Sequence, residues 1–254
     1  MTVDYERYAR ERPIFWGEIE YPKIFLDAIA GSSGTYVDIG AGDGGQIRSA
    51  LDQGLLSNFS RVVAVDISAE RIARMRPLLP EVEGIVADAQ SLPLPDGSVD
   101  FAYSSQVIEH VPDDLAMARE IRRILAPGGT AVVGSALRLR GAWYFYRCNG
   151  RWVLDPTHVR EYESVEQYVA VFRRAGLNVE LTAVYPIFYS ISDLMLRALT
   201  AARVLKADAA GSLYRRHRFL ERARAIKAAV PRYRHVFAHV TKPFFESPDA
   251  GPPA

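Results

Sequence analysis

Short apolar runs alternate with stretches of helical periodicity over residues 35–135. The apolar runs predict five strands, at residues 35–40, 61–66, 83–88, 98–105 and 130–135. Helical patterns follow at residues 46–51, 68–79 and 113–125, and Ser68 is placed to cap the second helix. Because strands that alternate with helices are typical of a parallel sheet covered by helices, we predict an α/β fold.

The pattern changes in the second half of the chain. Ser164-Val165-Glu166-Gln167 fits a capping box at the start of a helix. Residues 177–184 alternate strictly between apolar and polar positions, and residues 235–243 form the last strand candidate. The segment between these two strands is far too long for a hairpin loop, so we expect it to contain helices, including an amphipathic one at 187–205.

Composition narrows the class of protein. At 254 residues and 49% hydrophobic content, the chain can form one α/β domain with additions. Its single cysteine, Cys148, excludes a disulfide framework and a multi-cysteine zinc site. The N-terminus lacks the apolar core of a signal peptide, and charges interrupt every long apolar stretch. We therefore expect a cytoplasmic protein, with peripheral contact at the inner face of the membrane as an alternative.

Positive charge is concentrated near the C-terminus. Residues 197–242 contain twelve Lys and Arg but two Asp and Glu, although the net charge of the whole chain is +1. With the apolar residues that begin at Ile187, residues 187–230 can bind an anionic membrane, form a homodimer interface or act as a lid. We predict no nucleic-acid binding, because aromatic and basic residues do not interleave in a recognisable RNA-binding motif.

A glycine-rich turn follows the first predicted strand, in VDIGAGDGGQ at residues 37–46. Gly40, Gly42 and Gly45 fit the G-x-G-x-x-G of a dinucleotide site, whereas Asp38, Gly40, Gly42 and Gly44 fit the D-x-G-x-G-x-G of a methyl-donor site. In both cases a backbone without Cβ atoms can approach a ligand closely. Both also expect a carboxylate at the end of the second strand, where Asp66 lies.

Two further positions favour the methyl donor. Asp38 lies inside the first strand, where a buried carboxylate needs a partner such as the cationic amino group of the donor. The same carboxylate would repel a pyrophosphate. Asp88 and Ala89 close the third strand, where a carboxylate and the next backbone N–H can bind the edge of adenine.

The order of motifs resembles the class I S-adenosylmethionine-dependent methyltransferases, particularly the type 11 group. The matching segments are VDIGAGDGG, VVAVDIS, VADAQSLPLPDGSVDF, VIEHVPD and ILAPGGTAVV. The resemblance implies a Rossmann-like seven-stranded sheet of order 3-2-1-4-5-7-6, with an antiparallel last strand, helices on both faces and a helical insertion before that strand. We expect a helical lid at 1–34, the methyltransferase core at 35–186, a basic helical insertion at 187–234, and the last strand with a disordered tail at 235–254.

Donor-binding residues follow from this resemblance position by position. Asp38, Gly40, Ala41 and Gly42 would surround the methionine part of S-adenosylmethionine. Asp66 would bind the ribose hydroxyls, and Ile67 would pack on adenine. Asp88 and Ala89 would bind the adenine edge, and Ser105 and Gln106 would approach the donor from the fourth strand.

Two histidines are candidates for the general base. The sulfonium of the donor is already activated, so transfer depends mainly on alignment, but a hydroxyl acceptor benefits from a group that removes its proton. His110 follows the fourth strand on the ligand side, and His158 lies in the segment expected to cover the pocket. Glu109 would orient the donor or a histidine, or serve only the local fold.

We assign no metal ligands, and Mg²⁺ is the alternative cofactor that we weigh and do not favour. Asp155, His158, Glu161 and Glu163 are close enough in sequence to hold Mg²⁺, but nothing fixes their geometry, so loop polar residues are the favoured interpretation.

The acceptor is the least determined part of the prediction. Residues 143–152 are rich in aromatic side chains and lie near the expected carboxyl edge of the sheet. These side chains would bind a sugar or a flat phenol, or form a packed lid. DPTHVREYES and VFRRAGLNV resemble segments of bacterial methyltransferases of polysaccharide and glycan clusters. We therefore expect O-methylation of a saccharide, glycolipid or related bacterial metabolite. A phenolic or quinol-type acceptor, a nicotinamide dehydrogenase and a non-catalytic binding subunit are the alternatives.

Overall fold

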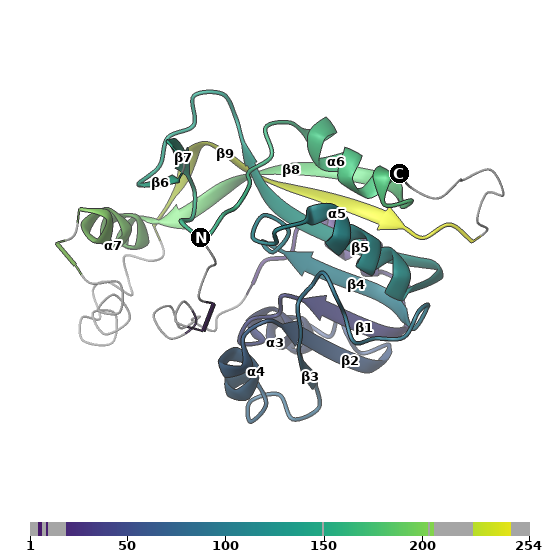
Figure 1. Cartoon of the computed structure of the whole chain (residues 1–254). Coiled ribbons are helices and arrows are strands. Elements are labelled where there is room, and N and C mark those ends of the chain that lie inside the picture. The colour runs from purple at the N-terminus through teal and green to yellow at the C-terminus, as the bar shows by residue number, and fades with distance from the viewer. Residues whose placement is uncertain are drawn as a thin grey trace.

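A seven-stranded sheet forms the centre of the molecule (Figure 1). The computed structural model describes residues 5, 6, 9, 19–148, 150–202, 204–205 and 226–244. The predicted basic residues at 206–225 and the predicted disordered tail from residue 245 lie outside these ranges. Within the described residues, no helix is both long and apolar enough to cross a membrane.

The strand order is β3-β2-β1-β4-β5-β9-β8, and β9 runs antiparallel to both of its neighbours. The predicted order is confirmed, because β8 and β9 are the sixth and seventh strands of this sheet along the chain. The strands are β1 Gly34–Ile39, β2 Phe59–Asp66, β3 Glu83–Val86, β4 Val99–Ser105, β5 Leu125–Arg138, β8 Asn178–Ser190 and β9 Lys227–Thr241.

Helices cover both faces of the sheet, as predicted. They are α2 Lys23–Ile29, α3 Gly45–Asp52, α4 Ala69–Met75, α5 Asp114–Ile124, α6 Val165–Arg174 and α7 Ile191–Ala201. Val37 packs with α5 and α6 in one apolar cluster, whereas its neighbour Tyr36 packs with α2, α3 and α4 in the other. The two clusters follow from the alternation of side chains along a strand. Ser68 and Ser164 cap α4 and α6 through their side chains, as the sequence predicts.

The predicted helical insertion is shorter than residues 187–234. β8 continues to Ser190 and β9 begins at Lys227, and Ser190 pairs with Lys227. The run Ile187-Phe188-Tyr189 fits an amphipathic helix by spacing, but Ile187 is buried in a third apolar cluster with Tyr233 and other residues of the long strands. Packing against the extended ends of β5 and β9 therefore overrides the helical pattern there.

A second, two-stranded sheet was not predicted. It consists of β6 Tyr146–Cys148 and β7 Arg151–Val153, which pair antiparallel. β3 is also shorter than predicted, because it ends at Val86 rather than at residue 88. The chain turns at Asp88, whose carboxylate accepts a hydrogen bond from the Gln90 N–H at 2.9 Å.

Candidate functional site

The turn after β1 is built from glycines in left-handed conformations. Gly40, Gly42 and Gly44 have φ angles of 80°, 59° and 80°. A Cβ on Gly40 would lie 2.2 Å from Cγ2 of Val107, so a side chain does not fit there. The N–H of Gly40 donates to the carbonyl of Val65 at 2.7 Å, which ties the turn to the end of β2.

The carboxylate of Asp66 accepts hydrogen bonds from two backbone N–H groups, one of them in the glycine turn. Its Oδ2 accepts the N–H of Gly42 at 2.8 Å, and its Oδ1 accepts the N–H of Ser68 at 2.9 Å. The carboxylate is therefore fixed before any ligand arrives, and each oxygen keeps a further lone pair for a hydroxyl group.

Asp38 is buried and incompletely paired. Its residue exposure is 2%, and Oδ2 has no hydrogen-bond partner among the residues that the structure describes. Burial and the nearby charge of Asp66 raise the pKa of Asp38 to about 8. A cationic ligand group beside Oδ2 would supply the missing partner and stabilise the ionised form.

A cavity opens beside these carboxyl ends of the strands. Its empty volume is about 770 Å³, which includes space open to solvent. Seven of the predicted site residues line it: Gly40, Asp66, Ile67, Asp88, Ala89, Gln106 and His110. Five others do not: Asp38, Ala41, Gly42, Ser105 and His158. The wall also includes Tyr5, Arg71, Gln90 and Thr157, which sequence reasoning did not identify.

Gln90 joins two parts of this wall. Its side-chain N–H groups reach both oxygens of Asp88 at 3.1 Å, and its Oε1 accepts the N–H of Asp113 at 2.9 Å. Ile67 is 45% exposed, which leaves its side chain free to pack on a planar ligand group.

Gln106 lies just beyond β4 with a φ of 60°, a conformation that non-glycine residues rarely adopt. Its Nε2 lies 3.3 Å from Nδ1 of His235 on β9. Burial lowers the pKa of His235 to about 4, so its neutral ring can accept this hydrogen bond. His235 is a site neighbour that the sequence analysis missed.

His110 is the predicted base candidate that lies on the cavity wall. Its Nδ1 lies 3.0 Å from Oγ1 of Thr157, and this hydroxyl donates to Oδ1 of Asp155 at 2.7 Å. Burial lowers the pKa of His110, opposed by the nearby charge of Glu109. The chain of contacts fixes the orientation of the ring.

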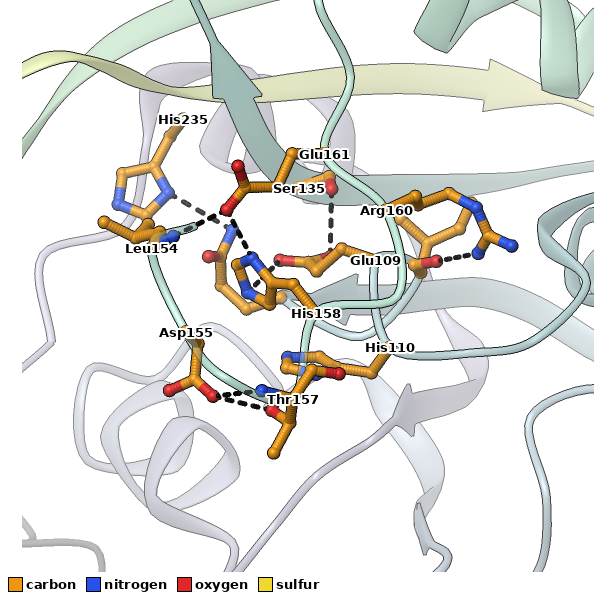
Figure 2. A network of polar contacts seen from close by, with 12 residues as sticks. Glu109, His110, Ser135, Leu154, Asp155, Thr157, His158, Arg160, Glu161 and His235 are labelled. Atoms are coloured by element: carbon orange, nitrogen blue, oxygen red, sulfur yellow. Dashed lines mark hydrogen bonds and ion pairs between the residues drawn. The ribbon is translucent and has the colours of Figure 1, made fainter. Parts of the chain in front are cut away.

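His158 lies behind His110, with the two ring centroids 4.8 Å apart. Its Nδ1 contacts Oε1 of Glu161 at 2.8 Å, and its Nε2 lies 4.0 Å from Oε1 of Glu109. Burial acts to lower the pKa of His158, but the Glu161 hydrogen bond and the surrounding carboxylates raise it above the ordinary value. The other oxygen of Glu109 accepts the hydroxyl of Ser135 at 2.9 Å (Figure 2).

Arg160 fastens the segment before α6 to the loop after β4. Its guanidinium donates to the carbonyls of Ile108 at 3.0 Å, Val111 at 2.5 Å and Pro112 at 2.5 Å. The N–H of Val159 also donates to the Glu109 carbonyl at 3.0 Å. These contacts bring DPTH and VIEH together although about fifty residues separate them.

The four residues considered for Mg²⁺ do not converge on one point. His158 and Glu161 contact each other directly, whereas the exposed Glu163 forms an ion pair with Arg138. Among the residues that the structure describes, the group that could hold a metal ion is Glu109, His110 and His158.

Aromatic rings gather around the small β6–β7 sheet. Trp143 lies 5.4 Å from Phe145 and 5.7 Å from Trp152, measured between ring centroids. Trp143 is 52% exposed, whereas Tyr144 is buried in the third apolar cluster. The predicted aromatic group therefore divides into a packed part and an exposed part.

Comparisons with known proteins agree with this architecture. Residues 37–133 match the family described as "Methyltransferase domain". A solved structure of a putative sarcosine dimethylglycine methyltransferase from Galdieria sulphuraria shares the fold, with a TM-score of 0.59 and 16% identity over 88% of this chain and 83% of that chain.

Curated relatives match over part of their length. A probable S-adenosylmethionine-dependent methyltransferase of Mycolicibacterium smegmatis is 33% identical over 48% of this chain and 45% of its own length. The 2-methyl-6-phytyl-1,4-hydroquinone methyltransferase of Synechocystis is 36% identical over 39% of this chain and 31% of its own length. The 27-O-demethylrifamycin SV methyltransferase of Amycolatopsis mediterranei is 30% identical over 57% and 54%, respectively. This chain thus spans about a third to a half of the relatives it matches. The matched motifs, with the strand order and the glycine turn, identify residues 37–133 as a methyltransferase domain of the class I S-adenosylmethionine-dependent type.

Proposed function

We propose that this protein transfers the methyl group of S-adenosylmethionine to a hydroxyl oxygen of a small-molecule acceptor. The observation that carries the donor assignment is the buried Oδ2 of Asp38 beside the glycine turn, which has no hydrogen-bond partner in the part of the chain that the structure describes. A cationic amino group satisfies such an oxygen and favours its ionised form, whereas a pyrophosphate would be repelled by the ionised carboxylate. The donor, when bound, supplies a sulfonium methyl group that is already activated for transfer.

The residues present fit the donor. Asp38, Gly40, Ala41 and Gly42 would hold its methionine part, and Asp66 would accept its ribose hydroxyls. Ile67, Asp88 and Ala89 would contact adenine, with Ser105 and Gln106 at the side of the methyl group. Asp66 supports this proposal because its carboxylate is already oriented by two backbone N–H groups on the cavity wall.

The acceptor hydroxyl would bind near His110. Because Nδ1 of His110 is committed to Thr157, Nε2 is the nitrogen that can take a proton from the acceptor. His158 does not line the cavity and contacts Glu161, so its proposed role is to support His110 rather than to act as the base.

We propose a saccharide or glycolipid as the acceptor. Exposed Trp143, beside Phe145 and Trp152, offers an aromatic surface of the kind that packs on sugar rings. The rifamycin relative acts, by its name, on an oxygen. A phenolic or quinol-type acceptor is the second candidate, favoured by the hydroquinone methyltransferase among the relatives.

The N-terminal segment is proposed to cover the cavity. Tyr5 lies on its wall and donates a hydrogen bond from its hydroxyl to the His110 carbonyl at 3.0 Å. Glu6 accepts the N–H of Ala69 at 2.7 Å at the start of α4. These two contacts connect the segment before residue 10 to both sides of the cavity.

Residues 187–230 are proposed to contact a membrane surface or a second copy of the chain. Within the described part, Phe188, Ile191 and Met195 are 52%, 49% and 47% exposed. Flotation of the protein with anionic vesicles supports the membrane, whereas a dimer without flotation supports self-association.

Calorimetric titration with S-adenosylmethionine, S-adenosylhomocysteine and NAD in parallel tests the donor assignment. We expect both sulfur nucleosides to bind and NAD not to bind; the reverse result would refute it. Mass spectrometry of glycan and quinol panels incubated with labelled donor then identifies the acceptor class. Transfer to quinols alone would reject the saccharide.

A further inference from the structure

Glu109, His110 and His158 each present one possible metal-ligand atom at the same place, and these three atoms lie within 4.8 Å of one another. Glu109 and His110 belong to the loop after β4, whereas His158 belongs to the segment before α6. The cluster is therefore made by the fold and not by local sequence, and it differs from the Asp155, His158, Glu161 and Glu163 set that the sequence suggests.

Each of the three side chains has one polar atom in contact with another residue, which orients it. Nδ1 of His158 contacts Glu161, and Nδ1 of His110 contacts Thr157. Oε2 of Glu109 accepts the hydroxyl of Ser135. These contacts leave Nε2 of both histidines and Oε1 of the glutamate for a common ligand. Histidines that bind metals are typically oriented in this way by a carboxylate, carbonyl or hydroxyl on the opposite nitrogen.

Glu109 supplies an independent sign of a missing ligand. The residue is fully buried, and its Oε1 has no hydrogen-bond partner within the described ranges. Nε2 of His158 is 4.0 Å from this oxygen, which is too far for a hydrogen bond. Leaving a buried carboxylate oxygen unpaired is costly, so a group that fits between these two atoms would be favoured.

A metal ion has the size to fill this gap. Around a tetrahedral zinc ion with bonds of about 2.0–2.2 Å, neighbouring ligand atoms lie about 3.3–3.6 Å apart, so the 4.0 Å between Nε2 of His158 and Oε1 of Glu109 would close by roughly half an ångström. The three atoms lie within 4.8 Å of one another, so the widest of their separations would close by at most about 1.5 Å as the ion draws the side chains together.

We infer that Glu109, His110 and His158 form a binding site for one divalent transition-metal ion, such as Zn²⁺. Two imidazoles and one carboxylate suit such ions better than Mg²⁺, which prefers oxygen ligands. Three protein ligands leave an open position, and His110 places the site at the cavity wall.

The role of the ion rests on the proposed function. An acceptor hydroxyl bound at the open position would lose its proton to water more readily. Its oxygen would then bond to the methyl carbon of the donor as the carbon–sulfur bond breaks and S-adenosylhomocysteine leaves. Because the ion would occupy Nε2 of His110, it would replace the free imidazole as the activating group.

Metal titration of the full-length protein tests the site without donor or acceptor. After removal of bound metal by a chelator, the protein is titrated with Zn²⁺, Co²⁺ and Mg²⁺ in a calorimeter, and Co²⁺ is also followed by its visible absorption. We expect one Zn²⁺ or Co²⁺ per chain and no comparable binding of Mg²⁺. Absence of Zn²⁺ and Co²⁺ binding, or binding of Mg²⁺ alone, overturns the inference.

Matched variants locate the ion. Glu109→Gln keeps the shape but removes the charge, and Glu161→Gln removes the partner of His158; each should weaken Co²⁺ binding by about tenfold or more. His239→Gln changes a histidine on β9 outside the cluster and should bind as the unchanged protein does. Equal binding by all three variants would place the ion elsewhere and overturn the inference.

Two further measurements separate the possible failures. His110→Gln changes a half-buried ligand at the cavity wall, so it tests the site if Glu109→Gln does not fold. Its loss of Co²⁺ absorption supports the site, and unchanged absorption overturns it. Ion binding without methyl transfer would support the metal site and count against the proposed function. Full methyl transfer by protein that binds no ion would support the proposed function and overturn the metal site.

Discussion

Donor binding should release a proton from Asp38. The carboxyl group is buried, its pKa is raised to about 8, and its Oδ2 has no partner within the described residues. In the free protein below that pKa, the group therefore holds a proton. A cationic amino group beside Oδ2 favours the ionised form, so binding of S-adenosylhomocysteine below pH 8 expels the proton.

The magnitude follows from linkage between binding and protonation. Binding that requires the ionised carboxylate becomes up to about tenfold weaker for each pH unit below the pKa, or roughly 1.4 kcal/mol. Affinity should therefore rise as pH increases towards 8 and lose this dependence above it. Asp38→Asn cannot ionise, so its affinity should not follow this slope, and its disadvantage should grow towards pH 8 and stay at its largest above it.

Calorimetry in buffers with different ionisation enthalpies measures the released protons directly. Near pH 6.5, we expect close to one proton per S-adenosylhomocysteine for the unchanged protein and close to none for Asp38→Asn. Asp27→Asn, which changes an exposed aspartate paired with Lys23, is the control and should release the same proton as the unchanged protein. Equal proton release with Asp38→Asn would refute the placement of the amino group beside this carboxylate.

Three other substitutions test separate parts of the site. Asp66→Ala should weaken donor binding by about 1–3 kcal/mol through loss of charge-assisted hydrogen bonds to the ribose, and unchanged affinity by calorimetry would contradict its placement. Arg160→Ala leaves three carbonyls without their donor and should lower the free energy of unfolding by about 1–3 kcal/mol, measured by urea denaturation. The exposed Arg174→Ala should change it little. Trp143→Ala should raise KM for a saccharide acceptor and spare donor affinity; an unchanged KM would argue against the aromatic surface.

The residues that line the cavity from the strand ends could be predicted, because their positions follow from the sheet. In a parallel sheet the carboxyl ends of neighbouring strands meet at one edge, so Gly40, Asp66, Asp88 and Gln106 reach the same cavity whatever the rest of the chain does. Tyr5 and Thr157 also line the cavity, but their segments are positioned by tertiary packing. No periodicity in the sequence indicates where these two segments lie.

The small β6–β7 sheet could have been found from the sequence. Asn149-Gly150 lies between Tyr-Arg-Cys and Arg-Trp-Val, and an Asn-Gly pair between such runs is a strong hairpin signal. The strand ends at 187–190 and 227–234 could not be predicted from the sequence, because the apolar positions from Ile187 to Leu194 fit both helical and extended spacing. Only the pairing of Ser190 with Lys227 decides between them.

The contacts of Arg160 have a consequence for acceptor specificity. The residues that match the methyltransferase family end at 133, yet the loop carrying His110 is fastened by a residue beyond that limit. Replacement of residues 141–163 by the equivalent segment of another methyltransferase would therefore change more than the acceptor surface. Unless an arginine at this position is retained, we expect the exchange also to release the cavity wall that carries His110, so the proposed donor and acceptor sites would not be separable modules.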